Sequence, residues 1–279
     1  MNIQIAHNAG FCSGVEKAYN IALETSKKNI PIYVLGYLVH NSFVISKLES
    51  QGLKTIKSLS EIPSGQKCAL IISAHGVGPH IYEEAEKRHV EIVDTTCAWV
   101  KKAQRIARDL GRSGYQIIIV GDKDHTEVKG ITGWAGENNA VIVQSLSDLD
   151  KIAFSDKVAV VAQTTQSLEN FNAIVEELKK RTKDLVVHNT ICGATFRRQA
   201  SAVDLAKASD IMLILGDRRS ANTKRLKELC EKTGTPTFQI QDASELDKKW
   251  LNGKNNIGIT AGASTPQEII AQVVNKINA

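Results

Sequence analysis

The stretch AGFCSGVEKAY (residues 9–19) decides how this chain folds, because its pattern recurs twice. It returns as DTTCAWVKKAQ around Cys97 and as NTICGATFRRQ around Cys192. In each copy an apolar, extended run ends close to the cysteine, and residues with helical periodicity follow at once. The cysteine of each copy therefore lies at a predicted turn from a strand into a helix.

This position has chemical consequences for the thiol. A helix N-terminus offers N–H groups and about half a positive charge, which stabilise a thiolate. Ser13 and Glu16 have the spacing of a capping box, so the first helix is expected to begin just after Cys12. Three thiolates, one from each third of the chain, indicate one iron–sulfur or zinc site. The alternative for any single cysteine is a small core residue.

The spacing of the cysteines predicts the domain organisation. They are 85 and 95 residues apart, and runs typical of strands alternate with runs typical of helices throughout the 279 residues. Such alternation favours the α/β class, with mainly parallel sheets built from βαβ units. A chain of this length exceeds one small core. We therefore predict three similar α/β units, at residues 13–96, 97–191 and 192–279.

Turn and cap residues predict several element boundaries. The run PIYVLGYLVHN (residues 31–41) is predicted to be a strand that delivers His40 at its end. Gly111 is expected to end the helix that follows Cys97. In the last helix, Thr265 is the expected cap and Pro266 the first residue.

Polar residues follow further predicted strands in all three units. Ligands of open α/β sheets bind beyond the carboxyl ends of strands, so we expect these side chains to face one cavity together with the cysteines. Imidazoles, hydroxyls and helix amides suit a phosphate or diphosphate. The alternative for each residue is an ordinary loop position or helix cap. The residues are His40, His75, His125, Thr164, Ser220, Asn222 and Ser264.

Glu127 stands two residues after His125, at the start of a predicted helix. A carboxylate at a strand end can pass protons into a cavity if its pKa suits the step. Equally, the helix dipole favours a glutamate in a first turn without any catalytic role. The sequence leaves both interpretations open.

Composition limits the classes of partner. The 35 Lys and Arg residues exceed the 30 Asp and Glu residues by a formal charge of +5, and they are interspersed. This surplus suits anionic small molecules or an acidic protein partner, and no basic block is typical of a nucleic-acid-binding arm. No GxGxxG follows a strand, and no P-loop or CxxC motif occurs.

The sequence also predicts where the protein works. No apolar run approaches the roughly 20 residues that cross a bilayer, and the first residues, MNIQIAHNAGF, lack the pattern of a secretory signal. We therefore expect a cytoplasmic protein without membrane contact. Five cysteines in that setting do not indicate a disulfide scaffold. Cys68 and Cys230, within apolar runs, are expected to be core residues.

Nine motifs in register carry a resemblance to a known family over almost the whole chain, from near residue 1 to about residue 278. The chain resembles the LytB family, the 4-hydroxy-3-methylbut-2-enyl diphosphate reductases that complete the methylerythritol phosphate route to isoprenoids. The motifs are GFCSGV, YLVHN, SAHGV, DTTC, HTE, AQTTQS, TICGAT, SAN and GITAGAS.

The resemblance implies a pseudo-threefold trefoil of three α/β units around a central 4Fe-4S cluster, with residues 1–12 packed onto the third unit. It implies Cys12, Cys97 and Cys192 as the cluster ligands, with one iron open. The implied diphosphate ligands are His40, His75, Ser220, Asn222 and Ser264. The residues implied around the allylic hydroxyl are His125, Glu127 and Thr164, with Glu127 as the proton source.

The implied reaction removes the substrate hydroxyl as water and uses two electrons, giving isopentenyl or dimethylallyl diphosphate. Acidic carriers such as ferredoxin or flavodoxin are the implied donors. The chain departs from the common family pattern at Ala98 and Thr126, where many relatives have proline, and at Ala221, where many have serine. A hydro-lyase with an open iron and a redox-sensing binding protein are the rival functions.

Overall fold

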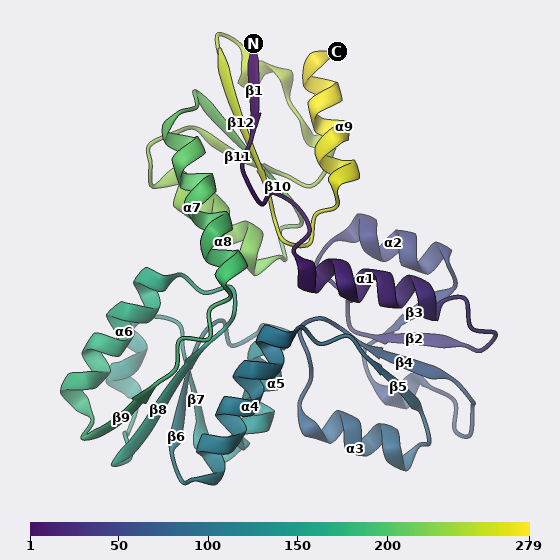
Figure 1. The fold of residues 1–279 in the computed structure, drawn as a ribbon, viewed down its shortest axis with the longest axis vertical. Coiled ribbons are helices and arrows are strands. Elements are labelled where there is room, and N and C mark those ends of the chain that lie inside the picture. The colour runs from purple at the N-terminus through teal and green to yellow at the C-terminus, as the bar shows by residue number, and fades with distance from the viewer. The chain divides into compact units, whose positions relative to one another are not determined.

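Three four-stranded sheets form the framework of the chain (Figure 1). The computed structural model describes residues 1–279, apart from the side chain of Glu137. All nine strand pairings within the sheets are parallel. Helices flank each sheet, so the predicted α/β class with parallel sheets is confirmed.

The first sheet has the strand order β3-β2-β4-β5. Its interior strand β4 reads ALII and is buried along its whole length, as expected for a parallel strand covered on both faces. The strands are β2 (Ile32–Leu35), β3 (Leu53–Ile56), β4 (Ala69–Ile72) and β5 (Glu91–Asp94). The helices in this part of the chain are α1 (Ser13–Thr25), α2 (Ser42–Ser50) and α3 (Pro79–Lys87).

The second sheet has the order β7-β6-β8-β9, and its core is rich in valine and isoleucine from β6 and β8. The strands are β6 (Gln116–Val120), β7 (Ala140–Val143), β8 (Lys157–Ala162) and β9 (Asp184–Val187). The helices are α4 (Ala98–Arg112), α5 (Thr126–Ala135) and α6 (Leu168–Arg181).

The third sheet joins the two ends of the sequence. β1 pairs in parallel with β12, in a register that runs from Asn2 opposite Asn256 to Ile5 opposite Ile259. The sheet order is β1-β12-β10-β11. Its strands are β1 (Asn2–Ile5), β10 (Ile211–Leu215), β11 (Thr237–Ile240) and β12 (Asn256–Ala261). Its helices are α7 (Gly193–Lys207), α8 (Ala221–Glu231) and α9 (Gln267–Asn278).

The chain divides into two compact units, which we describe separately. Unit 1 contains Met1–Glu16, Val39–Ser46 and Gly193–Ala279. Unit 2 contains Lys17–Leu38 and Lys47–Cys192, and therefore holds both the first and the second sheet. None of the described helices is both long and apolar enough to cross a lipid bilayer.

Two predicted helix boundaries are wrong. Gly111 lies inside α4, which continues to Arg112, and a Cβ atom at this glycine would clash with the carbonyl oxygen of Ala135. The glycine therefore allows α5 to pack closely on α4, as Figure 1 shows, and does not end the helix. In the last helix, Thr265 donates its hydroxyl proton to the Leu215 carbonyl at 3.1 Å, and Pro266 takes the cap position.

Candidate functional site

The three repeated cysteines occupy equivalent positions relative to the strands. Each lies one residue before a helix, because α1, α4 and α7 begin at the next residue. Each cysteine N–H donates to a carbonyl two residues beyond the end of a neighbouring strand. The bonds run from Cys12 to Ala263 (3.2 Å), from Cys97 to Ala74 (3.1 Å) and from Cys192 to Thr164 (2.9 Å). The strand-to-helix turns predicted from the repeat are confirmed.

One detail at the first cysteine differs from the prediction. The Cys12 carbonyl accepts the first helical hydrogen bond, from the Glu16 N–H at 2.9 Å, and Ser13 is already helical. Cys12 thus takes the cap position that the capping-box pattern had assigned to Ser13. The thiol is therefore closer to the positive end of the helix dipole than the sequence pattern indicated.

The three cysteines of the repeat suit a metal cluster better than the other two cysteines of the chain do. Cys12, Cys97 and Cys192 are partly exposed. Cys68 and Cys230 are buried in the cores, as predicted. Burial raises the pKa of Cys68, and burial together with Glu231 raises the pKa of Cys230 to about 12. A metal binds the thiolate, so these two core thiols are poor ligands.

Glu127 and Thr164 form a buried pair at the carboxyl end of the second sheet. One carboxylate oxygen of Glu127 accepts from the Thr164 N–H at 2.6 Å, and the other accepts from the Thr164 hydroxyl at 2.9 Å. Glu127 is 2% exposed. Burial raises its pKa to about 7, although both hydrogen bonds from Thr164 lower it. A carboxyl group with this pKa can hold or release a proton near neutral pH.

Two histidines lie beside this pair in unit 2. His125 caps α5, and its Nδ1 accepts from the Glu127 N–H at 3.2 Å, so a neutral His125 ring carries its proton on Nε2. The ring of His75 stands edge-on to it, with ring centroids 5.3 Å apart. The Nδ1 atom of His75 also lies 3.4 Å from the Ser73 hydroxyl. The structure therefore brings together His75, His125, Glu127 and Thr164.

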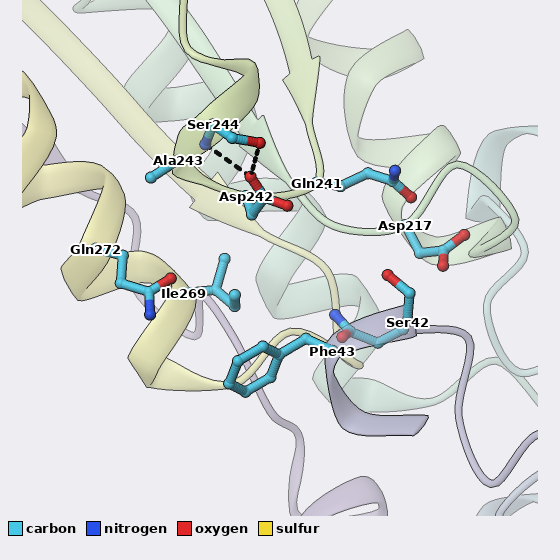
Figure 2. Close-up of a pocket in the computed structure, with 10 residues that line it drawn as sticks. Ser42, Phe43, Asp217, Gln241, Asp242, Ala243, Ser244, Ile269 and Gln272 are labelled. Atoms are coloured by element: carbon cyan, nitrogen blue, oxygen red, sulfur yellow. Dashed lines mark hydrogen bonds between the residues drawn. The ribbon is translucent and has the colours of Figure 1, made fainter. Parts of the chain in front are cut away.

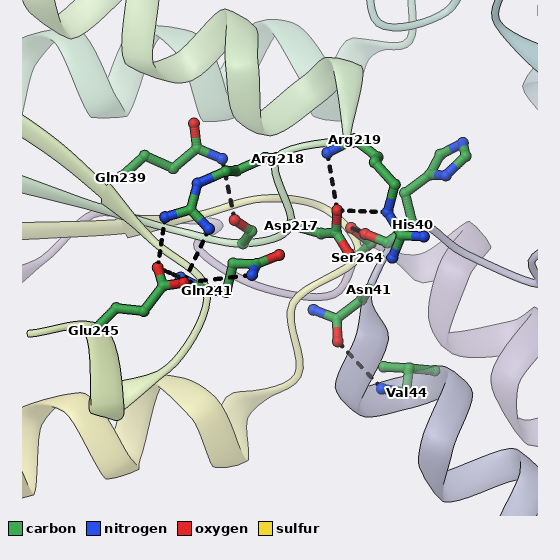
Figure 3. Close-up of polar contacts among 11 residues, drawn as sticks. His40, Asn41, Val44, Asp217, Arg218, Arg219, Gln239, Gln241, Glu245 and Ser264 are labelled. Carbon is green, nitrogen blue, oxygen red and sulfur yellow. Dashed lines mark hydrogen bonds and ion pairs between the residues drawn. The ribbon is translucent and has the colours of Figure 1, made fainter.

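His40 lies in a loop of unit 1, and the prediction of a strand ending at this residue is wrong. β2 ends at Leu35, because Gly36 takes a left-handed conformation with φ of +67°. The His40 carbonyl accepts from the Ser264 hydroxyl at 2.9 Å. The next residue, Asn41, accepts the Val44 N–H at 3.1 Å through its side chain (Figure 3). Hydrogen bonds therefore hold this loop at both His40 and Asn41.

An ion pair that the sequence analysis missed lies beside His40. Asp217 is 2% exposed and accepts two side-chain hydrogen bonds from Arg219, at 2.9 and 2.6 Å (Figure 3). Arg219 is the main cause that lowers the pKa of Asp217. Burial lowers the pKa of His40, and the charge of Arg219 lowers it further against the opposing charge of Asp217. This environment favours a neutral His40 imidazole.

The N-terminus of α8 holds a buried carboxamide without a protein partner. Asn222 is 4% exposed, and neither its Nδ2 nor its Oδ1 has a hydrogen-bond partner among the described residues. Ser220 caps the helix by accepting the Thr223 N–H at 3.3 Å. A buried amide left unpaired costs about 1–3 kcal/mol. An oxygen of a ligand could accept from Nδ2 and remove that atom's share of the cost, and the helix dipole there favours an anion.

A cavity of about 320 Å³ lies next to this region of unit 1 (Figure 2). Its wall includes Asn41 and Asp217, but none of the seven residues predicted to bind substrate. Asp242, which also lines the cavity, accepts hydrogen bonds from the N–H and the hydroxyl of Ser244, at 2.7 and 2.5 Å (Figure 2). The remaining lining residues are Ser42, Phe43, Gln241, Ala243, Ile269 and Gln272.

A second residue that the sequence analysis missed holds the loop before Cys12. Arg198 on α7 is 2% exposed, and its guanidinium donates to the carbonyls of Asn8 and Gly10, both at 2.7 Å. The only sequence signal was its place in the third cysteine motif, where Arg197 is an equal candidate. Asp217 and Arg219 stand just before the SAN motif in the sequence, but their pairing depends on the geometry of the turn.

The comparison with protein families and curated sequences gives one consistent result. The family model described as "LytB protein" matches residues 3–278. The chain is 44% identical over 277 residues to the 4-hydroxy-3-methylbut-2-enyl diphosphate reductase of Clostridioides difficile, covering 98% of each sequence.

Two solved structures are also similar to the whole chain. One is the E-1-hydroxy-2-methyl-but-2-enyl-4-diphosphate reductase from Plasmodium falciparum, with a TM-score of 0.94 at 32% identity, covering 100% of this chain and 88% of that one. The other is an (E)-4-hydroxy-3-methyl-but-2-enyl diphosphate reductase described as the terminal enzyme of the non-mevalonate pathway, with a TM-score of 0.73 at 36% identity and 99% coverage of both chains.

Proposed function

Because the chain belongs to the LytB protein family, we propose that it is a reductase of (E)-4-hydroxy-3-methylbut-2-enyl diphosphate, the last enzyme of the non-mevalonate route to isoprenoids. The reaction breaks the allylic C–O bond. It consumes two electrons and two protons and releases water, with isopentenyl and dimethylallyl diphosphate as products. The chain is thus an oxidoreductase that requires an external electron donor.

We propose that Cys12, Cys97 and Cys192 hold a 4Fe-4S cluster. Three observations support this set: the shared position before a helix, the shared N–H anchor beyond a strand end, and the partial exposure of each thiol. A cluster held by three thiolates supplies Lewis acidity at its open iron and a path for electrons. Zinc with a histidine as fourth ligand is the alternative donor arrangement.

The diphosphate ligands are proposed to be His40, His75, Ser220, Asn222 and Ser264. The unpaired carboxamide of Asn222 is the observation that supports this role best, because a diphosphate oxygen can accept from its Nδ2. When the diphosphate is bound, the substrate hydroxyl is held in one position. This lowers the entropic part of the activation barrier.

Glu127 is proposed as the proton source for the leaving hydroxyl, with Thr164 and His125 as its partners. Thr164 orients the carboxyl group through two hydrogen bonds, and His125 lies at the start of the same helix. Since the pKa of Glu127 is raised to about 7, the group remains partly protonated at neutral pH and can donate. The buried pair of Glu127 and Thr164 is the observation that best supports Glu127 as the acid.

The decisive test is an assay of anaerobically purified protein. We expect about four irons per chain, an electron paramagnetic resonance signal of the reduced protein that changes on adding the allylic diphosphate, and turnover only when a reductant is present. Turnover without reductant would support the hydro-lyase, and bound iron without any turnover would support a redox sensor. Zinc in place of iron would contradict the cluster assignment.

The electron donor is proposed to be an acidic carrier of the ferredoxin or flavodoxin type, for which the chain's +5 charge is suited. The cytoplasmic location predicted from the sequence remains a prediction.

A further inference from the structure

The exposed face of α4 concentrates the positive charge of this protein. The helix contains five basic residues and one acidic residue. Its formal charge of +4 compares with +5 for the whole chain, so the rest of the molecule is nearly neutral. The opposite face is buried against the sheet and α5, through Val100, Ala103, Gln104, Ala107 and Gly111 (Figure 1).

Most of these cations are not neutralised by the protein. Lys101 pairs with Asp94 at 2.7 Å, and Arg108 pairs with its neighbour Asp109 at 2.9 Å. Three cations on the helix have no carboxylate partner among the side chains that the structure describes, namely Lys102, Arg105 and Arg112.

The helix α6 shows the ordinary arrangement, in which cations on its exposed face pair with carboxylates of the same helix. Lys179 pairs with Glu176, and both Lys180 and Arg181 pair with Glu177. Cations near a helix N-terminus are disfavoured by the dipole, and α4 has two lysines there and no acidic residue in its first turn. The stability of the helix therefore does not explain its composition.

An exposed aromatic residue lies at the start of this face. Trp99 is 39% exposed, stands two residues after Cys97, and has the Lys102 ammonium 5.3 Å from its ring. Tryptophan and arginine are enriched in protein interfaces, where they carry much of the binding energy. The face thus combines an aromatic anchor with a positive field that begins beside a proposed cluster ligand.

We propose that one face of α4 forms the docking surface for an acidic electron-carrier protein. This surface, the α4 face, consists of Trp99, Lys102, Arg105 and Arg112. This inference rests on the proposed function, since a reductase needs two electrons for each substrate. Each docked carrier is oxidised by one electron, so two encounters complete one turnover. Charge complementarity selects an acidic protein and raises its association rate, most strongly at low salt.

The test compares two reductants on the loaded enzyme. One is an electrochemically reduced bacterial ferredoxin, and the other is reduced methyl viologen, a small dication that needs no docking surface. The variant is Lys102→Glu/Arg105→Glu. The matched control is Lys54→Glu/Lys57→Glu, which makes the same charge change at exposed positions on and beside β3, the edge strand farthest from β5 in the first sheet.

In the α4 variant we expect the KM for ferredoxin to rise about tenfold and its dependence on salt to weaken, because two favourable charges are reversed. Turnover with viologen should stay within about twofold of wild type, as a dication is not repelled by added carboxylates. Ferredoxin binding measured by calorimetry, without turnover, should weaken in parallel. The control should resemble wild type in all three measurements.

Several outcomes overturn the proposal. These are an unchanged ferredoxin KM and binding constant in the α4 variant, an equal loss in the control, or tight binding of the face to a DNA duplex with no effect on ferredoxin. Absence of turnover with viologen in the wild-type protein would instead contradict the proposed function, so the two failures are distinguishable.

Discussion

At the scale of the residue, the proposed acid depends on a carboxyl group that is buried from water. Glu127→Gln preserves the shape of the side chain and can still accept from the Thr164 N–H, but it removes the transferable proton. We expect turnover to fall at least about 100-fold, the contribution typical of general acid catalysis. Iron content and substrate binding should be retained.

The pH profile gives a second measurement for the same residue. The protonated form of Glu127 is the active one, so wild-type kcat should be constant well below pH 7 and fall about tenfold per unit well above it, since the pKa is raised to about 7. The small residual activity of Glu127→Gln should lack this step. Near-normal activity in the variant would remove Glu127 from its role.

Arg198 gives a prediction about positioning. Its two hydrogen bonds fix the carbonyls of Asn8 and Gly10, which precede Cys12. Arg198→Ala leaves both carbonyls without this donor, and we expect the free energy of unfolding to fall by about 3 kcal/mol, from hydrogen bonds to a charged group. We also expect less iron per chain after anaerobic reconstitution.

The neighbouring Arg197 is exposed and provides the control, since Arg197→Ala should retain full iron content. Arg198→Lys should be intermediate, because one ammonium cannot donate to both carbonyls with the geometry of a guanidinium. Full iron content in Arg198→Lys and Arg198→Ala would contradict a positioning role.

At the scale of the element, the N-terminus of α8 is the proposed anion-binding feature of unit 1. Ala221 is its first residue and has no hydroxyl to offer a ligand. Ala221→Ser should therefore lower the inhibition constant of inorganic diphosphate and the KM for substrate, each by about threefold to tenfold, as expected for one added hydrogen bond. Asn222→Asp should raise both, because a carboxylate repels the anion.

The cap residue offers a comparison within the same helix. Ser220→Ala removes the bond to Thr223 and should cost about 1 kcal/mol of stability. An Ala221→Ser variant with unchanged diphosphate affinity would show that this helix end does not contact the ligand.

Elements with strong periodicity could be predicted from the sequence, and loop geometry could not. The apolar runs before Cys12, Cys97 and Cys192 place these residues before helices correctly, because burial of apolar surface dominates in both elements. The place of His40 was missed because a single left-handed glycine, Gly36, ends β2 early. Gly111 was misread because a close helix contact and a helix end require the same residue.

The candidate site shows the same limit. His125, Glu127 and Thr164 could be singled out because each follows a strand, and the structure brings them together. The pairing of Asp217 with Arg219, and of Arg198 with distant carbonyls, depends on side-chain direction in turns, which has no periodic signal in the sequence.

At the scale of the whole molecule, one repeated device, a thiol before a helix with its N–H anchored beyond a strand, occurs in each third of the chain. If the three thiolates hold one cluster, each is required for assembly. Cys97→Ser should therefore abolish the brown colour, the iron content and the paramagnetic signal of the reduced protein, while circular dichroism of the apoprotein remains close to that of wild-type apoprotein.

The two core cysteines are the internal controls for this prediction. Cys68→Ser and Cys230→Ser place a hydroxyl in an apolar core and should lower the melting temperature, yet they should leave iron content per folded chain unchanged, because burial keeps both thiols protonated. If either core variant loses its iron while remaining folded, the ligand set is wrong. If Cys97→Ser keeps four irons per chain, the thiolates of the repeat do not act as one set, and the cluster must draw on other residues.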